Sequence, residues 1–212
     1  MLPRLTPVTT ALLIIISAVW FYEAATGAYL NEQQLAALGA IVPGLLQRHE
    51  YWRLVAAMFL HGFWWHWGLN CWALYQLGTL YETLFGSVRF TVIYFVTGII
   101  ASAASSLHMQ QGLGVGASGA IFGILGAFIF SIRRSPQYRH QPWTRSLINQ
   151  LAFWIVANVI IGFSFPGIDN TAHIAGLVSG LLLGFWPHRV PPPPPRDMII
   201  DIPPPPQSYG SE

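Results

Sequence analysis

Several runs of about 20 apolar residues, each nearly free of charge, limit the fold of this chain more than any other feature, since a helix of that length spans a bilayer. Only 8% of the 212 residues are charged and 53% are hydrophobic. An ordinary soluble domain has about 25% charged residues, and so few charges cannot cover a soluble surface. The chain is therefore predicted to be an all-α integral membrane protein.

The charges and the single cysteine exclude several other classes of protein. Ten basic residues stand against eight acidic ones, a formal net charge of +2, so no nucleic-acid partner is expected. Cys71 alone cannot form an internal disulfide or a multi-cysteine metal site, and we expect it to be a packed apolar side chain. Every basic residue is arginine, which is typical of a GC-rich genome and favours a bacterial source.

Six membrane spans are predicted, followed by a tail. The spans are residues 8–28, 66–85, 88–107, 118–132, 146–165 and 171–187. The first is interpreted as a span and not as a cleaved signal peptide, because Glu23 interrupts its apolar run and no soluble domain follows. Residues 29–65 then form a long outer loop between the first two spans. Residues 1–187 make the membrane domain.

The arginines predict the orientation of these spans. If the N-terminus is inside, the outer segments hold only Arg48 and Arg53, and the inner segments hold Arg4, Arg89, Arg133, Arg134, Arg139, Arg145, Arg189 and Arg196. This excess predicts that both termini are cytoplasmic and, in a bacterium, that the protein lies in the inner membrane. The proline-rich tail, residues 188–212, is expected to be disordered. The alternative is that the tail docks a proline-recognising partner.

Polar residues inside predicted spans are functional candidates because they are costly in lipid. Ser118 follows a glycine-rich segment and opens the fourth span, where free N–H groups favour a developing anion. That position suits an acyl-transfer nucleophile, although an N-cap serine would look the same. Ala120 stands where a hydrolase G-x-S-x-G elbow would need glycine.

His173 near the start of the sixth span is the matching candidate base. It shares a helix face with Gly176, Gly180 and Gly184. The fourth span has Gly119, Gly123 and Gly126, and small residues at such spacing let helices approach closely. Two helices packed through glycine would bring Ser118 and His173 into hydrogen-bond contact.

His61, His66 and Asn70 lead into the second span. His66 and Asn70 are four residues apart and share a helix face, so both can donate to an oxyanion. On a continuous helix His61 would lie about 140° away from His66. A metal site made with His173 is the rival, but no HExxH pattern or suitable carboxylate accompanies it. We therefore expect neither a metal nor a cofactor. Asp169 is expected to be a helix cap or loop residue and not the third member of a triad.

Taken in order, these residues resemble the rhomboid family of intramembrane serine proteases, over about residues 8–187. The shared motifs are Glu50-x-Trp52-Arg53, His61-x4-His66-x3-Asn70, Gly78-x3-Glu82-x3-Gly86, Gly116-Ala-Ser118-Gly119 and Ala172-His173-x2-Gly176-x3-Gly180. The resemblance implies a six-helix bundle with Ser118 as nucleophile and His173 as general base. His66, Asn70 and the Ser118 N–H match an oxyanion hole.

The resemblance also implies structural roles and a class of substrate. Trp52 and Arg53 match a loop motif, Glu82 a hydrogen-bonding position, and Gly176 and Gly180 close helix packing. Phe122 stands where some relatives have a tyrosine stacked on the histidine, and it keeps the ring. The implied substrates are transmembrane proteins in the bilayer. A non-catalytic relative that binds transmembrane helices and a polytopic transporter stay open as alternatives.

Overall fold

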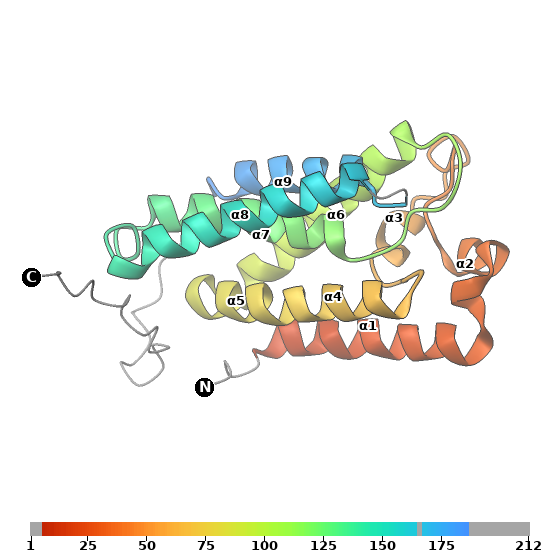
Figure 1. Cartoon of the computed structure of the whole chain (residues 1–212), viewed down its shortest axis with the longest axis horizontal. Coiled ribbons are helices and arrows are strands. Elements are labelled where there is room, and N and C mark those ends of the chain that lie inside the picture. The colour runs from red at the N-terminus through yellow and green to blue at the C-terminus, as the bar shows by residue number, and fades with distance from the viewer. Residues whose placement is uncertain (1–5, 165–166, 187–212) are drawn as a thin grey trace, which may run out of the picture.

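The computed structural model describes residues 6–164 and 167–186, and the regular structure of that part is entirely helical (Figure 1). Three helices are long and apolar enough to cross a membrane: α1 (Pro7–Thr26), α6 (Ser87–His108) and α8 (Pro142–Ser164). A shorter apolar helix, α9 (Asn170–Leu183), packs with α7 (Ser118–Arg134). The chain is thus an all-α membrane bundle, as predicted.

The helix bounds follow the predicted spans to within four residues. Gly27, in a left-handed conformation with φ of 72°, ends α1 two residues before the expected bound. Pro142 starts α8 four residues early because proline suits the first turn of a helix. The sixth predicted span is too long, since α9 ends at Leu183. Position 187 and the tail lie outside the described residues, and the number of spans stays a prediction.

The second predicted span is not one uniform α-helix. It consists of α4 (Trp64–Ala73), a π-helical turn, η2 (Leu74–Gly78), and α5 (Thr79–Phe85). A π-helical turn holds an extra residue, so it rotates α5 relative to α4. A Cβ at Gly78 would lie 3.0 Å from Thr9 Oγ1 and 3.1 Å from Phe90. The wide turn is therefore packed tightly against both α1 and α6.

Glu82 in α5 binds the start of α1. Its carboxylate accepts hydrogen bonds from the Thr9 N–H and hydroxyl, both at 2.8 Å, and from the Val8 N–H at 3.0 Å. The hydroxyls of Thr6 and Ser87 also donate to it, at 2.5 and 2.6 Å. A carboxylate at a helix N-terminus satisfies free N–H groups and complements the helix dipole. Glu82 thereby ties α1 to the second span.

The connection between α1 and α4 gathers at one end of the bundle, beside the loop from 109 to 117 (Figure 1). It contains a short 3-10 turn, η1 (Ala28–Leu30), and two short helices, α2 (Glu32–Leu38) and α3 (Arg53–Ala56). An antiparallel bridge between Ile41 and Gly114 joins the two loops. This end of the bundle carries the candidate site.

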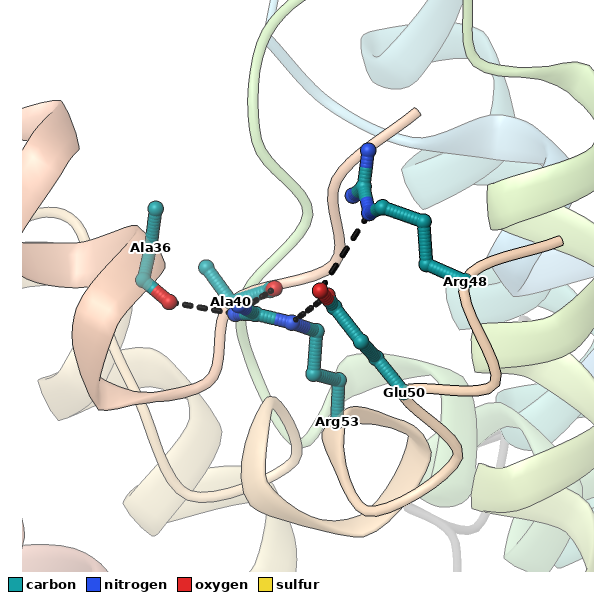
Figure 2. Close-up of polar contacts among 5 residues, drawn as sticks. All are labelled: Ala36, Ala40, Arg48, Glu50 and Arg53. Carbon is teal, nitrogen blue, oxygen red and sulfur yellow. Dashed lines mark hydrogen bonds and ion pairs between the residues drawn. The ribbon is translucent and has the colours of Figure 1, made fainter. Parts of the chain in front are cut away.

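Arg53 fastens this loop through three groups (Figure 2). Its Nε donates to Glu50 at 2.5 Å, while Nη1 donates to the carbonyls of Ala36 and, at 3.2 Å, Ala40. Cations are favoured at the carbonyl end of a helix such as α2. The Arg53 guanidinium also lies 4.7 Å from the Trp52 ring centroid, a cation–π contact. Glu50 also forms an ion pair with Arg48, with 3.2 Å between Arg48 Nε and Glu50 Oε1. Arg53 lowers the pKa of Glu50 below its ordinary value.

Candidate active site

The hydroxyl of Ser118 and the imidazole of His173 are in direct contact, with 2.9 Å between Oγ and Nε2. Ser118 is the first residue of α7 and His173 lies in the first turn of α9. The His173 side chain is largely buried, with 7% of the residue exposed. Because α7 begins at Ser118, the N–H groups around it have no partner within the helix. The pair therefore combines a hydroxyl, a possible base and free backbone donors.

Glycines on both helices make this contact possible. A Cβ at Gly176 would lie 2.1 Å from the carbonyl oxygen of Gly119, and one at Gly180 only 1.9 Å from that of Gly123. A Cβ at Gly126 would likewise meet the Leu177 carbonyl oxygen at 2.3 Å. The helices thus touch backbone to backbone along their length, as small residues permit in membrane bundles. This close packing determines the distance between Ser118 and His173.

Phe122, one turn after Ser118, stacks on the His173 ring. The two centroids are 4.3 Å apart and the planes differ by 7°. In the described part of the chain, His173 Nδ1 has no hydrogen-bond partner. The orientation of the imidazole therefore comes from the stacked ring and from the Ser118 contact.

Asp169 caps α9 and makes no hydrogen bond with the His173 ring. Its Oδ1 accepts the Ala172 N–H at 2.9 Å, and its Oδ2 accepts the hydroxyl of Ser105 in α6. Both oxygens are thus engaged away from Nδ1. Asp169 therefore has the helix-capping role expected of it.

His66 and Asn70 of α4 approach the loop that precedes Ser118. Gly116 has φ of 121°, and a Cβ there would lie 2.7 Å from His66 Nε2 and 3.7 Å from Asn70 Nδ2. Only glycine therefore fits between these side chains and the loop. Asn70 Nδ2 also donates to the His66 carbonyl at 2.9 Å, which fixes its side chain on the face that meets the loop.

His61 lies upstream of α4, which begins at Trp64. The angular relation that assumed a continuous helix was therefore wrong, and the two imidazoles meet instead, with centroids 5.1 Å apart. The fully buried carboxylate of Glu23 in α1 accepts the His61 N–H through both oxygens at 3.3 Å. Glu23 was not predicted as a site residue, although a lone carboxylate in an apolar run was the signal for it.

The histidines do not assemble as a metal centre in the part of the chain that the structure describes. No group of three His, Cys, Asp or Glu side chains there is arranged to hold an ion. His173 Nε2 is engaged with Ser118. Cys71 is half-buried and packs against the core. A cavity of about 40 Å³ adjoins Ser118, and its walls include Met58, Gly98 and Ala101.

The fold and site define a polytopic helical membrane protein with a serine–histidine pair at one end of its bundle. A family model described as the Rhomboid domain matches residues 48–189, more than half of the chain. The chain belongs to the rhomboid family, and thereby to a family of intramembrane proteases.

Three curated proteins illustrate this relationship. The chain is 34% identical over 175 residues to Rhomboid protease GluP of Bacillus subtilis, covering 82% of this chain and 34% of that protein. It is 37% identical over 152 residues to RHOMBOID-like protein 1 of Arabidopsis thaliana, covering 71% and 38%. It is 32% identical over 157 residues to Rhomboid-like protease 5 of Toxoplasma gondii, covering 73% and 18%. The chain thus spans well under two thirds of the length of these relatives.

Proposed function

We propose that this protein is an intramembrane serine endopeptidase that cleaves transmembrane proteins with a dyad of Ser118 and His173. The observation that carries the proposal is the 2.9 Å contact between Ser118 Oγ and His173 Nε2 at the start of α7. An ordinary serine hydroxyl is a weak nucleophile and needs a positioned base to take its proton. The His173 imidazole is within the reach that general-base catalysis requires.

The mechanism follows serine acyl-transfer chemistry. Neutral His173 takes the proton from Ser118 as the oxygen attacks a peptide carbonyl. The resulting oxyanion is stabilised by the Ser118 N–H and by side-chain donors from His66 and Asn70. His173 then protonates the leaving amine. In the second half, His173 takes a proton from water as that water attacks the acyl-enzyme, and it returns the proton to Ser118 as the ester bond breaks.

The substrate must present an unwound segment. A transmembrane helix hides its carbonyls in its own hydrogen bonds, so residues with low helix propensity near the cut favour cleavage. The cavity beside Ser118 is small, about 40 Å³, which favours a small side chain such as alanine at the cleaved residue. Trp52, Arg53, His61 and Glu82 support the site by holding the loop and α1 in position.

Localisation and the tail complete the proposal. Both termini are cytoplasmic, because arginines are concentrated on that side, and the membrane is the inner membrane of a bacterium. Residues 1–187 form the catalytic domain. Residues 188–212 form a separate tail whose proline runs offer a site for a proline-recognising module.

The decisive experiment incubates the purified full-length protein, in detergent or lipid, with a single-span substrate. Ser118→Ala and His173→Ala should each abolish cleavage, and the double variant should be no worse because the two residues act as a unit. A fluorophosphonate should label Ser118 only when His173 is present. Cleavage should survive chelators and fall at acidic pH, where protonated His173 cannot act as a base.

Two results would refute this mechanism. Substantial cleavage by purified Ser118→Ala excludes a serine nucleophile. Loss of cleavage with a chelator, restored by zinc and without labelling of Ser118, makes His61, His66 and His173 metal ligands instead. A folded wild-type protein that binds transmembrane helices, but neither cleaves nor reacts with the probe, is a non-catalytic member of the family.

A further inference from the structure

A second cleft is lined by residues of α7, of α8 and of the connection between them. This connection lies at the end of the bundle opposite to the start of α7 (Figure 1), where Ser118 lies. Its volume is about 410 Å³, and Arg133, Arg139 and Arg145 line it together with His140, Ile148 and Asn149. None of these residues belongs to the site around Ser118, so the cleft has no role in the proposed mechanism.

The three arginines are not neutralised by the described part of the chain. No Asp or Glu occurs between Glu82 and Asp169, and none of the hydrogen bonds or ion pairs among described residues involves these guanidinium groups. Three other arginines of the described residues have polar partners. Arg48 and Arg53 pair with Glu50, and Arg89 donates to Ser131 and to the Gly184 carbonyl. The cleft is therefore a local concentration of positive charge that has no acidic partner among residues 6–164 and 167–186.

The backbone beneath the cleft is well defined. The ring of Tyr138 is buried next to Phe85, with centroids 5.7 Å apart. The Tyr138 carbonyl accepts the Thr144 hydroxyl and, at 3.0 Å, the Gln141 N–H. The Arg139 N–H donates to the Ser135 carbonyl at 2.9 Å. These hydrogen bonds fix the backbone around Arg139, so a ligand would not have to order this part of the chain.

One face of α8 continues from this cleft as an apolar stripe. Arg145 and Asn149 line the cleft, and Phe153, Val156 and Ile160 follow them at spacings of three and four residues. Residues at these spacings share a helix face. The three apolar side chains are 64%, 56% and 60% exposed. The face thus changes from cationic to apolar along a membrane-spanning helix, as a phospholipid changes from headgroup to acyl chain.

We propose that the cleft formed by Arg133, Arg139 and Arg145 binds the phosphate headgroup of an anionic phospholipid, with an acyl chain along the exposed face of α8. The planar guanidinium donates two parallel hydrogen bonds to phosphate oxygens. Basic pockets at the ends of membrane helices bind anionic headgroups in this way. A free phosphate offers the same oxygens but cannot use the apolar stripe.

The test titrates short-chain phosphatidylglycerol into the full-length protein in neutral detergent and counts bound lipids by native mass spectrometry. Three adjacent charges each contribute about fivefold to headgroup affinity, so the triple change R133Q/R139Q/R145Q should weaken binding about 100-fold. Arg134→Gln is the matched control, because Arg134 lies outside the cleft lining and stacks 5.4 Å from the Phe185 ring. It should change affinity less than about twofold, within the scatter of a non-contacting charge.

Further arms distinguish the possible ligands. Phosphatidylcholine, inorganic phosphate and glycerophosphoglycerol, which is the headgroup without chains, should each bind much more weakly than phosphatidylglycerol. Equal binding of inorganic phosphate would make this a site for the free ion and overturn the lipid assignment. If Arg134→Gln lost as much affinity for phosphatidylglycerol as the triple variant, the binding would depend on diffuse surface charge and the proposed site would be wrong. Circular dichroism and the thermal midpoint confirm that each variant is folded. If the triple variant is unfolded, Arg139→Gln and Arg145→Gln alone decide the result.

Discussion

Gly180 of α9 rests directly on the carbonyl group of Gly123 in α7, so that a Cβ at position 180 would lie 1.9 Å from that oxygen. Gly180→Ala must therefore push the two helices apart. Overpacking of this kind costs about 1–3 kcal/mol of unfolding free energy. Unfolding of the purified protein in detergent should show this loss.

The matched control for that change is Gly68→Ala in α4. A Cβ at Gly68 would meet nothing within 4 Å, and alanine favours helix over glycine. Gly68→Ala should thus leave stability unchanged or raise it. Equal midpoints for the two variants would show that the α7–α9 contact adapts without cost.

His66 and Asn70 should act in turnover more than in substrate binding, because the oxyanion forms only after attack. Removal of one oxyanion donor typically lowers kcat about 100–1,000-fold. His66→Ala and Asn70→Ala should fall within or below that range, since the backbone N–H remains. Steady-state kinetics with a single-span substrate would measure kcat and KM separately. Leu69→Ala, in the same helix but 61% exposed, should leave kcat unchanged. If kcat were unchanged in both His66→Ala and Asn70→Ala, these residues would have a role in packing and not in the oxyanion hole.

Asp169→Asn should retain most activity. Asparagine also caps helices well. Its oxygen can accept the Ala172 N–H, while its NH₂ group can donate to the Ser105 hydroxyl, which reverses the direction of that hydrogen bond. Cleavage assays should therefore find Asp169→Asn close to wild type, while Asp169→Ala loses stability through the missing cap. A loss of kcat in Asp169→Asn as large as in His173→Ala would instead make the carboxylate part of a triad.

Glu82→Ala should destabilise the protein by at least about 3 kcal/mol, because one hydrogen bond to a charged group contributes about 1.5–3 kcal/mol. Five donors converge on this carboxylate. Glu82→Gln keeps one acceptor oxygen and should lose less. Glu32→Gln, at an exposed position in α2, serves as the control in the same denaturation experiment. If Glu82→Ala did not change the stability, water would have to satisfy the hydrogen-bond donors at the start of α1.

The ion pair of Arg53 with Glu50 predicts a pH dependence for the loop between α1 and α4. Arg53 holds the pKa of Glu50 below its ordinary 4.5. A lowered carboxyl pKa stabilises the folded loop above the unfolded value, and this contribution is lost as the pH falls through the folded value. Hydrogen exchange of residues 39–56, corrected for intrinsic rates, should stay constant from pH 7 to about 5 and rise below the ordinary pKa. Glu50→Gln should remove this step, and a step that persists would belong to another group.

The helices were predictable from the sequence because a long run of apolar residues is typical of a helix that lies in lipid. The start of α7 at Ser118 followed from the glycine segment before it, and the shared glycine faces correctly indicated close contact between α7 and α9. These signals are local or periodic, so one chain is enough to detect them.

What could not be predicted depends on packing between distant segments. The burial of Glu23 against His61 joins residues that are 38 positions apart, and no periodicity connects a helix end to a loop. The π-helical turn at Leu74–Gly78 has an ordinary apolar sequence, and its Gly78 packs closely against Thr9 and Phe90, which lie far from it in the chain. Local sequence patterns do not predict contacts between segments that are far apart in the chain.

The shortness of α9 has a consequence for the lipid around the protein. Its 14 residues extend about 21 Å, against about 30 Å for the hydrocarbon of a typical bilayer. Ile174, Val178 and Leu182 on its outer face are 45%, 49% and 65% exposed. A hydrophobic face shorter than the hydrocarbon is accommodated by local thinning of the bilayer, by snorkelling of flanking side chains or by association with another helix. Where the bilayer thins beside α9, a full-length transmembrane segment that lies there is longer than the surrounding hydrocarbon, and one of its ends then reaches water.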